Sequence, residues 1–367
     1  MNLANRSDYG EKQRRLRAYM AEKGYEYAVL SRRDNFAWFT CGGDNKVLRS
    51  AEDGVGVLVV SQERVVCVAY YMDLDRIFDD ELQGLDIERK LIYWYDGGRQ
   101  ENAMKLTRGR VVSDMDIPGA ENRSYDILQL HYPLTENEVA RYREVGALCD
   151  TLLAGVAKEI HPGMTEHEIE AEILYAYGKH AMTPKVLLVG SDERIAKYRH
   201  PCASQKKLDR LVLIHPGAEK GNLHANITRM IYFGDTLPKD LEEKYDLLNE
   251  LQAQFFAMAK TGARFGDIYE TRKKILAERG YPDEWRCHAM GCVTGYTLAT
   301  DLPLLNNEPV RPNMPLDIFI TLRGAKVEEL ALTGDGGAEV FSATGKWPTR
   351  AYEYGGKQYD LPAIMLK

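Results

Sequence analysis

The sequence lacks any hydrophobic run long enough to cross a lipid bilayer. No apolar stretch approaches the roughly 20 residues that a transmembrane helix needs, so we expect no membrane-spanning segment. The opening residues, Met1–Asp8, also lack the apolar centre of a secretory signal peptide. Six cysteines are present without a repeated pair spacing, which argues against a disulfide framework and favours a reducing, cytoplasmic location.

A long basic tract is absent as well. The net charge is −7, and a mildly acidic chain without a run of lysine and arginine is not expected to take nucleic acid as its main partner. The composition, 44% hydrophobic and 28% charged, is that of an ordinary globular protein. A length of 367 residues favours two domains over one.

The first third of the chain has the pattern of an α/β domain. Apolar residues recur at helical spacing among charged ones over residues 9–23, which predicts an amphipathic helix. Residues 27–30 follow as a short buried strand. Two further apolar runs, 54–60 and 65–69, predict the strands of a hairpin.

A domain boundary is expected where a new helix opens. Thr135 is followed three residues later by Glu138, the signature of a capping box at a helix start. We therefore place the two domains at residues 1–131 and 132–367.

The second domain contains an internal repeat. Long helical segments at residues 136–158 and 239–259 each introduce a second helix and then a strand and hairpin region, at 185–233 and 285–333. A pattern that occurs twice suggests two related halves about a pseudo-two-fold axis. A ligand site is then expected in the concavity between the halves.

The hairpin predicted at residues 211–234 carries unusually many polar groups. If it is symmetric, His215 and Asn226 face each other across its two strands. Because side chains alternate between the faces of a strand, His224 and Thr228 should point the same way as Asn226. The alternative is a half-exposed sheet whose polar face is turned to water.

Four stretches, taken together and in order, resemble a known superfamily. The stretches are Val189–Glu193 with His200-Pro201, Leu213–Ala218 with Asn226–Arg229, His288–Gly295, and Lys326–Leu332. In this combination the chain resembles the pita-bread superfamily of aminopeptidase P, prolidase and creatinase. The resemblance implies an α/β creatinase-type N-terminal domain, an α+β pita-bread catalytic domain with pseudo-two-fold halves, and a homodimer.

The chain departs from the superfamily at the metal-binding positions. There the metallopeptidases use two aspartates, a histidine and two glutamates to hold two divalent ions. Two such ions bring a charge of about +4, which the one matching carboxylate cannot offset. We therefore expect no dinuclear centre and no cofactor; the alternative is one zinc ion on three of these residues, His215, Cys292 and Glu328. The five positions fall on His215, Asn226, Cys292, Phe319 and Glu328, with Glu329 as the alternative to the last.

Two mechanisms without a metal are compatible with these residues. Creatinase, as the resemblance implies, uses a histidine as acid and base, and His200 matches that position. Glu328 would assist as the retained carboxylate. Alternatively, Cys292 beside His215 becomes a thiolate nucleophile while Asn226 orients the ring. The simpler interpretation of Cys292 is a small side chain that fills a vacated site.

Further residues are predicted to contact a small substrate. Arg199 belongs to a basic cluster before His200, which suggests a ligand with a carboxylate. Arg33 and Trp38 lie in a polar and aromatic segment that forms either a substrate wall or a solvated surface. Arg229 is expected to pair with a carboxylate inside the fold. The complete substrate-binding set is His288, Asn226, His224, Tyr296, Phe319, Arg199, Trp38 and Arg33.

Three functions follow from this interpretation. The first is a metal-independent, creatinase-like hydrolase or lyase that acts on a C–N bond of a small amino-acid-like or peptide-like molecule. The second is a metallohydrolase like the Xaa-Pro aminopeptidases and dipeptidases, with altered ligands. The third is a non-catalytic relative that binds a peptide or protein.

Overall fold

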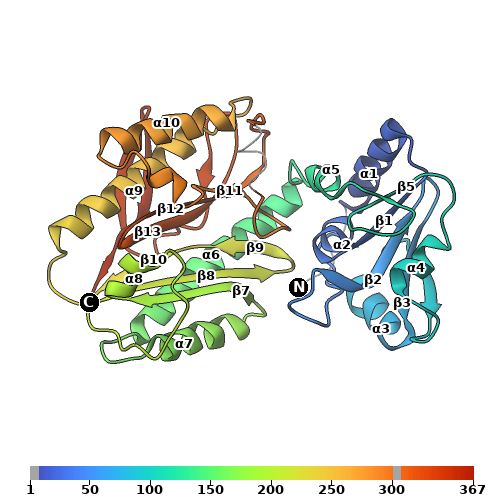
Figure 1. The fold of residues 1–367 in the computed structure, drawn as a ribbon, viewed down its shortest axis with the longest axis horizontal. Coiled ribbons are helices and arrows are strands. Elements are labelled where there is room, and N and C mark those ends of the chain that lie inside the picture. The colour runs from blue at the N-terminus through green and yellow to red at the C-terminus, as the bar shows by residue number, and fades with distance from the viewer. Residues whose placement is uncertain (1–7, 301–306) are drawn as a thin grey trace. The chain divides into compact units, whose positions relative to one another are not determined.

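The computed structural model describes residues 8–300 and 307–367 (Figure 1). The chain divides into two compact units, Met1–Asn137 and Glu138–Lys367. The boundary predicted between residues 131 and 132 lies shortly before this division. The opening residues considered above as a signal segment lie, apart from Asp8, outside the described residues. No helix within the described ranges is long and apolar enough to cross a membrane.

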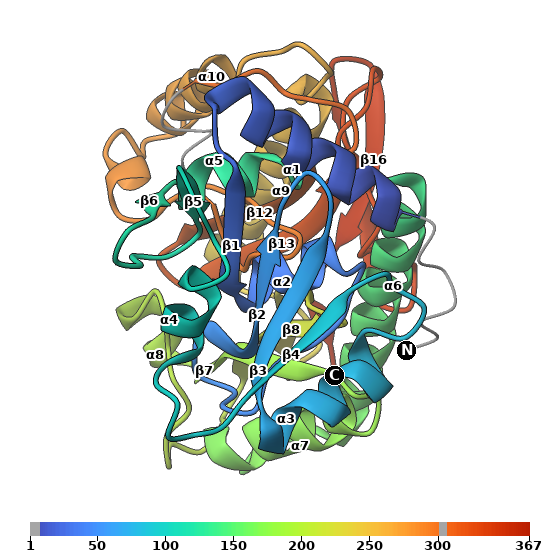
Figure 2. The ribbon, with the colours of Figure 1, turned by 90° about the vertical axis from the view of Figure 1, so that its right-hand side faces the viewer.

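Unit 1 is built on a six-stranded sheet with the order β4-β3-β2-β1-β5-β6 (Figure 2). Val29, Val57 and Val68 are fully buried between this sheet and its helices. The predicted helix, strand and hairpin are all present. The elements are α1 (Tyr9–Lys23), β1 (Tyr27–Arg32), α2 (Arg33–Phe39), β2 (Asp53–Val60), β3 (Val65–Tyr70), α3 (Tyr71–Arg76), a π-helical turn (Ile77–Glu81), β4 (Glu88–Ile92), α4 (Arg99–Met104), β5 (Val111–Ser113), β6 (Glu121–Asn122) and α5 (Ser124–Gln129).

Two residues predicted to form a substrate wall lie inside unit 1. The Trp38 ring is fully buried and stacks on His131 with ring centroids 4.8 Å apart. Arg33 is 7% exposed and donates to the carbonyl oxygen of Arg49 at 3.2 Å. The wall interpretation is therefore wrong for both, because the large apolar indole is more stable in the core than at a wet surface.

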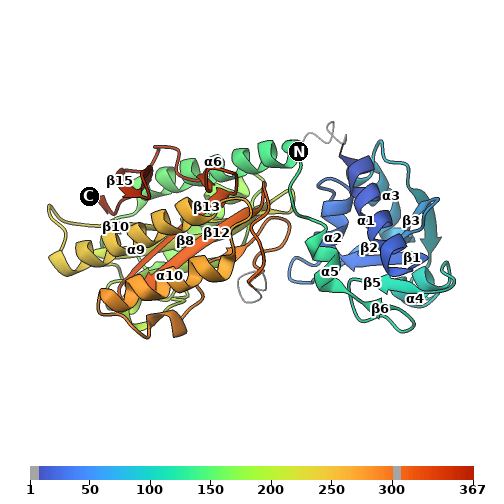
Figure 3. The ribbon, with the colours of Figure 1, turned by 90° about the horizontal axis from the view of Figure 1, so that it is seen from above.

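Unit 2 contains the repeated helix–helix–hairpin order that the sequence predicts. One sheet has the order β17-β10-β8-β7 with β9 paired to β8, and the other has the order β11-β12-β13-β14. Figure 3 shows α9 alongside β12 and β13, and α10 packs on α9. The elements are α6 (Glu136–Glu159), α7 (Glu166–Gly178), β7 (Thr183–Ser191), α8 (Glu193–Lys197), β8 (Leu211–Lys220), β9 (Leu223–Asn226), β10 (Arg229–Tyr232), α9 (Lys239–Met258), α10 (Phe265–Glu278), a 3-10 turn (Glu284–Arg286), β11 (Cys292–Val293), β12 (Pro315–Leu322), β13 (Ala325–Leu332), β14 (Glu339–Val340), β15 (Thr349–Tyr354), β16 (Lys357–Pro362) and β17 (Met365–Leu366).

The hairpin of β8 and β9 turns one residue later than a symmetric hairpin centred on Lys220-Gly221, which moves the partner of each residue by two positions. Its turn consists of Gly221 and Asn222, whose φ angles of 55° and 60° are both left-handed. A tight two-residue turn needs this conformation, and glycine and asparagine adopt it most readily. Asn226 therefore pairs with Gly217, and His215 contacts Thr228 instead of Asn226.

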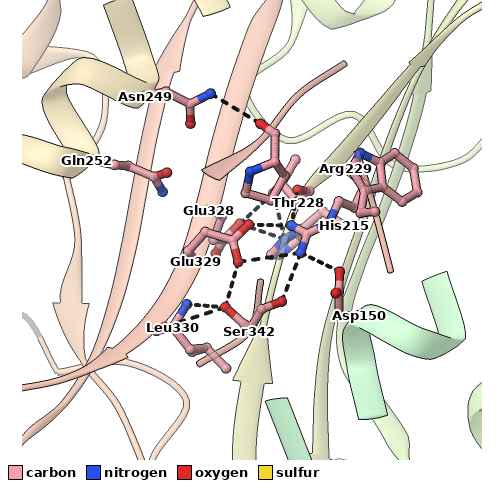
Figure 4. A network of polar contacts seen from close by, with 12 residues as sticks. Asp150, His215, Thr228, Arg229, Asn249, Gln252, Glu328, Glu329, Leu330 and Ser342 are labelled. Atoms are coloured by element: carbon pink, nitrogen blue, oxygen red, sulfur yellow. Dashed lines mark hydrogen bonds and ion pairs between the residues drawn. The ribbon is translucent and has the colours of Figure 1, made fainter. Parts of the chain in front are cut away.

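A buried arginine joins the two sheets to helix α6 (Figure 4). Arg229 on β10 is fully buried and donates to Asp150 Oδ1 at 2.9 Å and to the carbonyl oxygen of Ser342 at 3.0 Å. It also pairs with Glu329 of β13. Arg229 thus has the fold-holding role predicted for it, and Glu329 is occupied by this pair on the side of the sheet away from the candidate ligand positions.

Replacing Arg229 with alanine should destabilise the protein by about 3–5 kcal/mol, because Asp150 and Glu329 are then buried without a countercharge. The free energy of unfolding in urea measures this loss. The matched control is Arg143→Ala, which breaks a half-exposed pair with Glu339 and should cost about 0–1 kcal/mol. Equal losses in the two variants would contradict the structural role of Arg229.

Candidate functional site

A cavity of about 390 Å³ lies between the two sheets of unit 2. Strands β8, β9, β12 and β13 supply its polar side chains, and the loops before β8 and β11 supply two histidines. Six of the predicted site residues meet here. The lining consists of Val186, Leu188, His200, His215, Asn226, His288, Ala289, Leu298, Ala299, Asp317, Phe319, Lys326 and Glu328.

Glu328 is the centre of a buried cluster on one wall of the cavity (Figure 4). Its Oε2 atom lies 2.7 Å from His215 Nδ1, 2.8 Å from Lys326 Nζ and 2.7 Å from Thr228 Oγ1. Burial opposes ionisation of Glu328, but His215 and Lys326 outweigh it and hold the pKa of the carboxyl below its usual range. Glu328 is therefore an ionised carboxylate at neutral pH.

His215 and Lys326 play different parts in this cluster. Burial lowers the pKa of His215 despite the neighbouring carboxylate. The ring is then neutral at pH 7 and donates its Nδ1–H to Glu328, while the ammonium of Lys326 supplies the balancing charge. Lys326 was not among the predicted site residues. The sequence did contain a signal for Lys326: it stands two residues before Glu328, and residues two apart on a strand share a face.

A second polar group lies around Asp317, which the sequence analysis also missed. Asn226 Nδ2 donates to Asp317 Oδ2 at 2.7 Å, and Cys292 Sγ lies 3.9 Å from the same oxygen. Burial raises the pKa of Asp317 well above its ordinary value, and the nearby charge of Glu328 raises it further. Asp317 stands two residues before Phe319 on β12, so the same alternation brings it into the cavity.

His200 and His288 face each other across the cavity mouth. Their Nε2 atoms are 3.0 Å apart, and His288 Nδ1 lies 2.7 Å from the carbonyl oxygen of Ala289. Burial lowers the pKa of both rings, that of His288 to about 4. A neutral His288 that donates from Nδ1 must accept at Nε2, so His200 presents its Nε2–H to it. Phe319 packs edge-on against His288.

Besides Arg33 and Trp38 of unit 1, four predicted residues of unit 2 are not part of the cavity lining. His224 lies on β9 with its Nε2 3.8 Å from Glu219, and Tyr296 accepts a hydrogen bond from Arg141 at 3.0 Å. Arg199 donates to Thr321 at 3.0 Å. Cys292 is 1% exposed and its thiol contacts Asp317, whereas the contacts of His215 go to Glu328 and Thr228. The nucleophile interpretation of Cys292 stays a prediction.

Comparison with known proteins shows the family of this chain. Residues 140–338 match the family described as metallopeptidase family M24. This chain belongs to family M24. The recognition of the pita-bread superfamily and its fold class is thereby confirmed.

Curated relatives of this M24 chain are distant. An uncharacterized peptidase of Staphylococcus aureus strain MW2 is 22% identical over 243 residues, which cover 64% of this chain and 69% of that protein. An Xaa-Pro dipeptidase of Pyrococcus furiosus is 25% identical over 221 residues, 57% of this chain and 63% of the dipeptidase. A second staphylococcal peptidase, from strain MSSA476, is 23% identical over 185 residues, 50% of this chain and 52% of that protein.

Solved structures share the fold over nearly the whole chain. An Xaa-Pro dipeptidase from Bacillus anthracis aligns with a TM-score of 0.75 at 18% identity, covering 98% of this chain and 100% of that one. The N-terminal domain of the FACT complex subunit SPT16 from Cicer arietinum aligns with a TM-score of 0.68 at 11% identity, covering 92% and 97%.

Membership of a metallopeptidase family contradicts one prediction. The expectation that the chain takes no cofactor, with one zinc ion as its alternative, is wrong because the family to which it belongs is defined by metal-dependent peptidases. The described residues nevertheless do not fit the ligand set of a two-metal centre. No three histidine, cysteine, aspartate or glutamate side chains among them are grouped to hold an ion, and Lys326 lies 2.8 Å from the one matching carboxylate. The chemistry assigned to the cavity below is therefore that of its own side chains.

Alkylation of the native protein should separate a reactive Cys292 from a space-filling one. Cys202 and Cys287 are exposed, and burial shields the other four thiols. We expect iodoacetamide to modify Cys202 and Cys287 first and Cys292 only after unfolding, as measured by peptide mass spectrometry. Modification of Cys292 faster than Cys202 in the folded protein would instead identify a nucleophile.

Proposed function

We propose that this chain hydrolyses the peptide bond of a short peptide, as an Xaa-Pro dipeptidase-like member of family M24. The observation that carries the proposal is the meeting of His200, His288, Lys326 and Glu328 in one cavity. The relatives whose names state an activity include an Xaa-Pro dipeptidase. That activity favours the peptidase alternative over the metal-independent, creatinase-like hydrolase.

The cavity supplies several roles for its own side chains. His200 can donate its Nε2–H in a hydrogen bond to a peptide carbonyl, and the neutral His288 can take a proton from an attacking water and return it to the leaving amine. Phe319 of β12 and Val186 and Leu188 of β7 line the cavity with apolar side chains, which suit a small ring such as that of proline. The Lys326 ammonium fits a substrate that bears a carboxylate.

A specific observation supports a second candidate, a non-catalytic peptide-binding protein. Four of the five positions where the superfamily places metal ligands carry His215, Asn226, Cys292 and Phe319 instead. Such a cavity retains its shape and polar groups and would bind a peptide without cleaving it. A homodimer and a cytoplasmic location also remain predictions.

Dipeptide hydrolysis tests the proposed function. We expect release of amino acids from a panel of Xaa-Pro and other dipeptides, measured with and without added Mn²⁺. His200→Ala and His288→Ala should each lower kcat/KM by about 10²–10⁴-fold, the usual contribution of a proton-transferring group. The control is His167→Ala on α7, whose exposed ring faces solvent and Glu170.

Binding of the same peptides without turnover in any metal condition would favour the second candidate. Turnover that is unchanged in His200→Ala and His288→Ala would remove these rings from the mechanism. Calorimetric titration distinguishes binding from its absence.

The pH dependence of hydrolysis should reflect His200 and His288, which are only partly buried. Burial lowers the pKa of His200 and of His288 below the ordinary 6.5, so both rings stay neutral until the pH falls below that value. Protonation then removes the acceptor nitrogen. We expect kcat/KM to stay constant as the pH is lowered to 6.5 and to fall at lower pH. A decrease in kcat/KM whose midpoint lies above pH 6.5 would contradict this assignment.

A further inference from the structure

Unit 1 exposes a group of large side chains in one place. Trp94 is 71% exposed, and the other four members are between 44% and 66% exposed. Scattered apolar residues are normal on a protein surface, whereas a contiguous exposed patch marks an interaction surface. This group, the aromatic patch, consists of Tyr71, Met72, Tyr93, Trp94 and Tyr95.

The rings of the aromatic patch contact one another. Tyr93 stacks on Tyr71 with ring centroids 5.9 Å apart and on Tyr95 at 5.5 Å. Trp94 meets Tyr95 edge-on at 5.6 Å. Tyr71 begins α3 and Tyr93 follows β4, and these two elements are in contact (Figure 2). The patch is therefore one continuous surface built from two segments of the chain.

Hydrogen bonds fix the turn that carries three of these rings. The Asp96 carboxylate accepts from the Tyr93 backbone N–H at 2.8 Å, and the Asp96 N–H donates to the Tyr93 carbonyl oxygen at 2.9 Å. Asn102 Nδ2 donates to the carbonyl oxygens of Asp96 and Gly98 at 3.0 and 2.9 Å. A turn held in this way is ordered before a partner arrives, so binding costs less conformational entropy.

The segment that forms the patch is strongly acidic. Residues 71–101 include nine aspartates and glutamates but four lysines and arginines, so they hold −5 of the chain's net charge of −7. Asp73 and Asp96 are the immediate neighbours of Met72 and Tyr95 in the sequence. Three of the four basic residues are engaged elsewhere. Arg76 pairs with Glu81, Arg89 with Asp75, and Arg99 with Asp53.

The cation–π contacts of this segment also lie outside the aromatic patch. Arg89 stands over the Phe78 ring, 4.4 Å from its centroid, and Arg99 stands over the Tyr70 ring at 5.4 Å. The patch thus combines exposed aromatic rings, which attract cations, with neighbouring carboxylates that do the same. A partner that complements this surface is positively charged.

We infer that the aromatic patch binds a lysine- or arginine-rich segment of another protein. Its cationic side chains lie over the exposed rings and pair with Asp73 and Asp96. The phosphates of a nucleic acid or an anionic membrane would instead meet like charge, as would a second copy that brought the same patch. The inference goes beyond the proposed function and does not depend on hydrolysis in the cavity.

The test compares a cationic peptide with its neutral counterpart. The first probe is an acetylated and amidated eight-residue peptide of alternating arginine and threonine, and the second has citrulline in place of each arginine. Calorimetry with the full chain should show at least about 10-fold tighter binding of the arginine peptide. Added salt should weaken that binding, because the charged contacts are exposed to solvent.

Variants of the full chain locate the binding. Trp94→Ala and Tyr95→Ala should each weaken binding of the arginine peptide by about 2- to 30-fold, the range of one cation–π contact. Asp73→Asn should weaken it by up to about 5-fold. The matched controls should leave it unchanged. They are Tyr175→Ala, an exposed ring that already carries Lys179, and Asp240→Asn, whose carboxylate already pairs with Lys244.

Several outcomes would overturn the inference. These are equal binding of the arginine and citrulline peptides, an affinity that Trp94→Ala and Tyr95→Ala leave unchanged, and equal losses in the patch variants and the controls. Sedimentation velocity supplies another: a dimer that the wild type forms and Trp94→Ala does not would make the patch an interface between copies. Dipeptide hydrolysis by Trp94→Ala, expected at the wild-type rate, is measured separately, so failure of the proposed function does not affect this test.

Discussion

The buried ion pairs of Arg229 hold the polar wall of the cavity in position. Arg229 follows Thr228, and its partner Glu329 follows Glu328, and Thr228 and Glu328 are bridged by a backbone hydrogen bond. Because successive side chains point to opposite faces of a sheet, the core pair Arg229–Glu329 and the cavity pair Thr228–Glu328 stand back to back. The geometry of the site is thus set by a charge pair that never touches a ligand.

Much of the fold and part of the site could be predicted from the sequence. The helix, strand and hairpin patterns of unit 1 and the repeated order of unit 2 follow from apolar spacing. His200, His215, His288, Phe319 and Glu328 could be named from the sequence because motif positions transfer between distant relatives with the same fold. In the structure they line one cavity, and their roles in binding or catalysis stay predictions.

Other features depend on contacts that a pattern does not contain. The register of the hairpin was set by which two residues take left-handed angles, and Lys220-Gly221 was an equally plausible centre by symmetry. Trp38 was predicted at a substrate wall or a solvated surface because its segment mixes polar and aromatic residues, yet packing on His131 decides its place. Asp317 and Lys326 were missed because neither matches a ligand position of the superfamily. Each nevertheless stands two residues before a matched position, Phe319 or Glu328, and so shares its face of the strand.

The two-residue turn at Gly221 and Asn222 also constrains how this protein can evolve. Inserting or deleting one residue there would shift one strand by a single position and exchange the core and cavity faces of β9. Identities along β8 and β9 can therefore drift, as His215 and Asn226 illustrate, while the length of the hairpin cannot. New ligand preferences in this lineage are expected to arise by substitution within an unchanged frame.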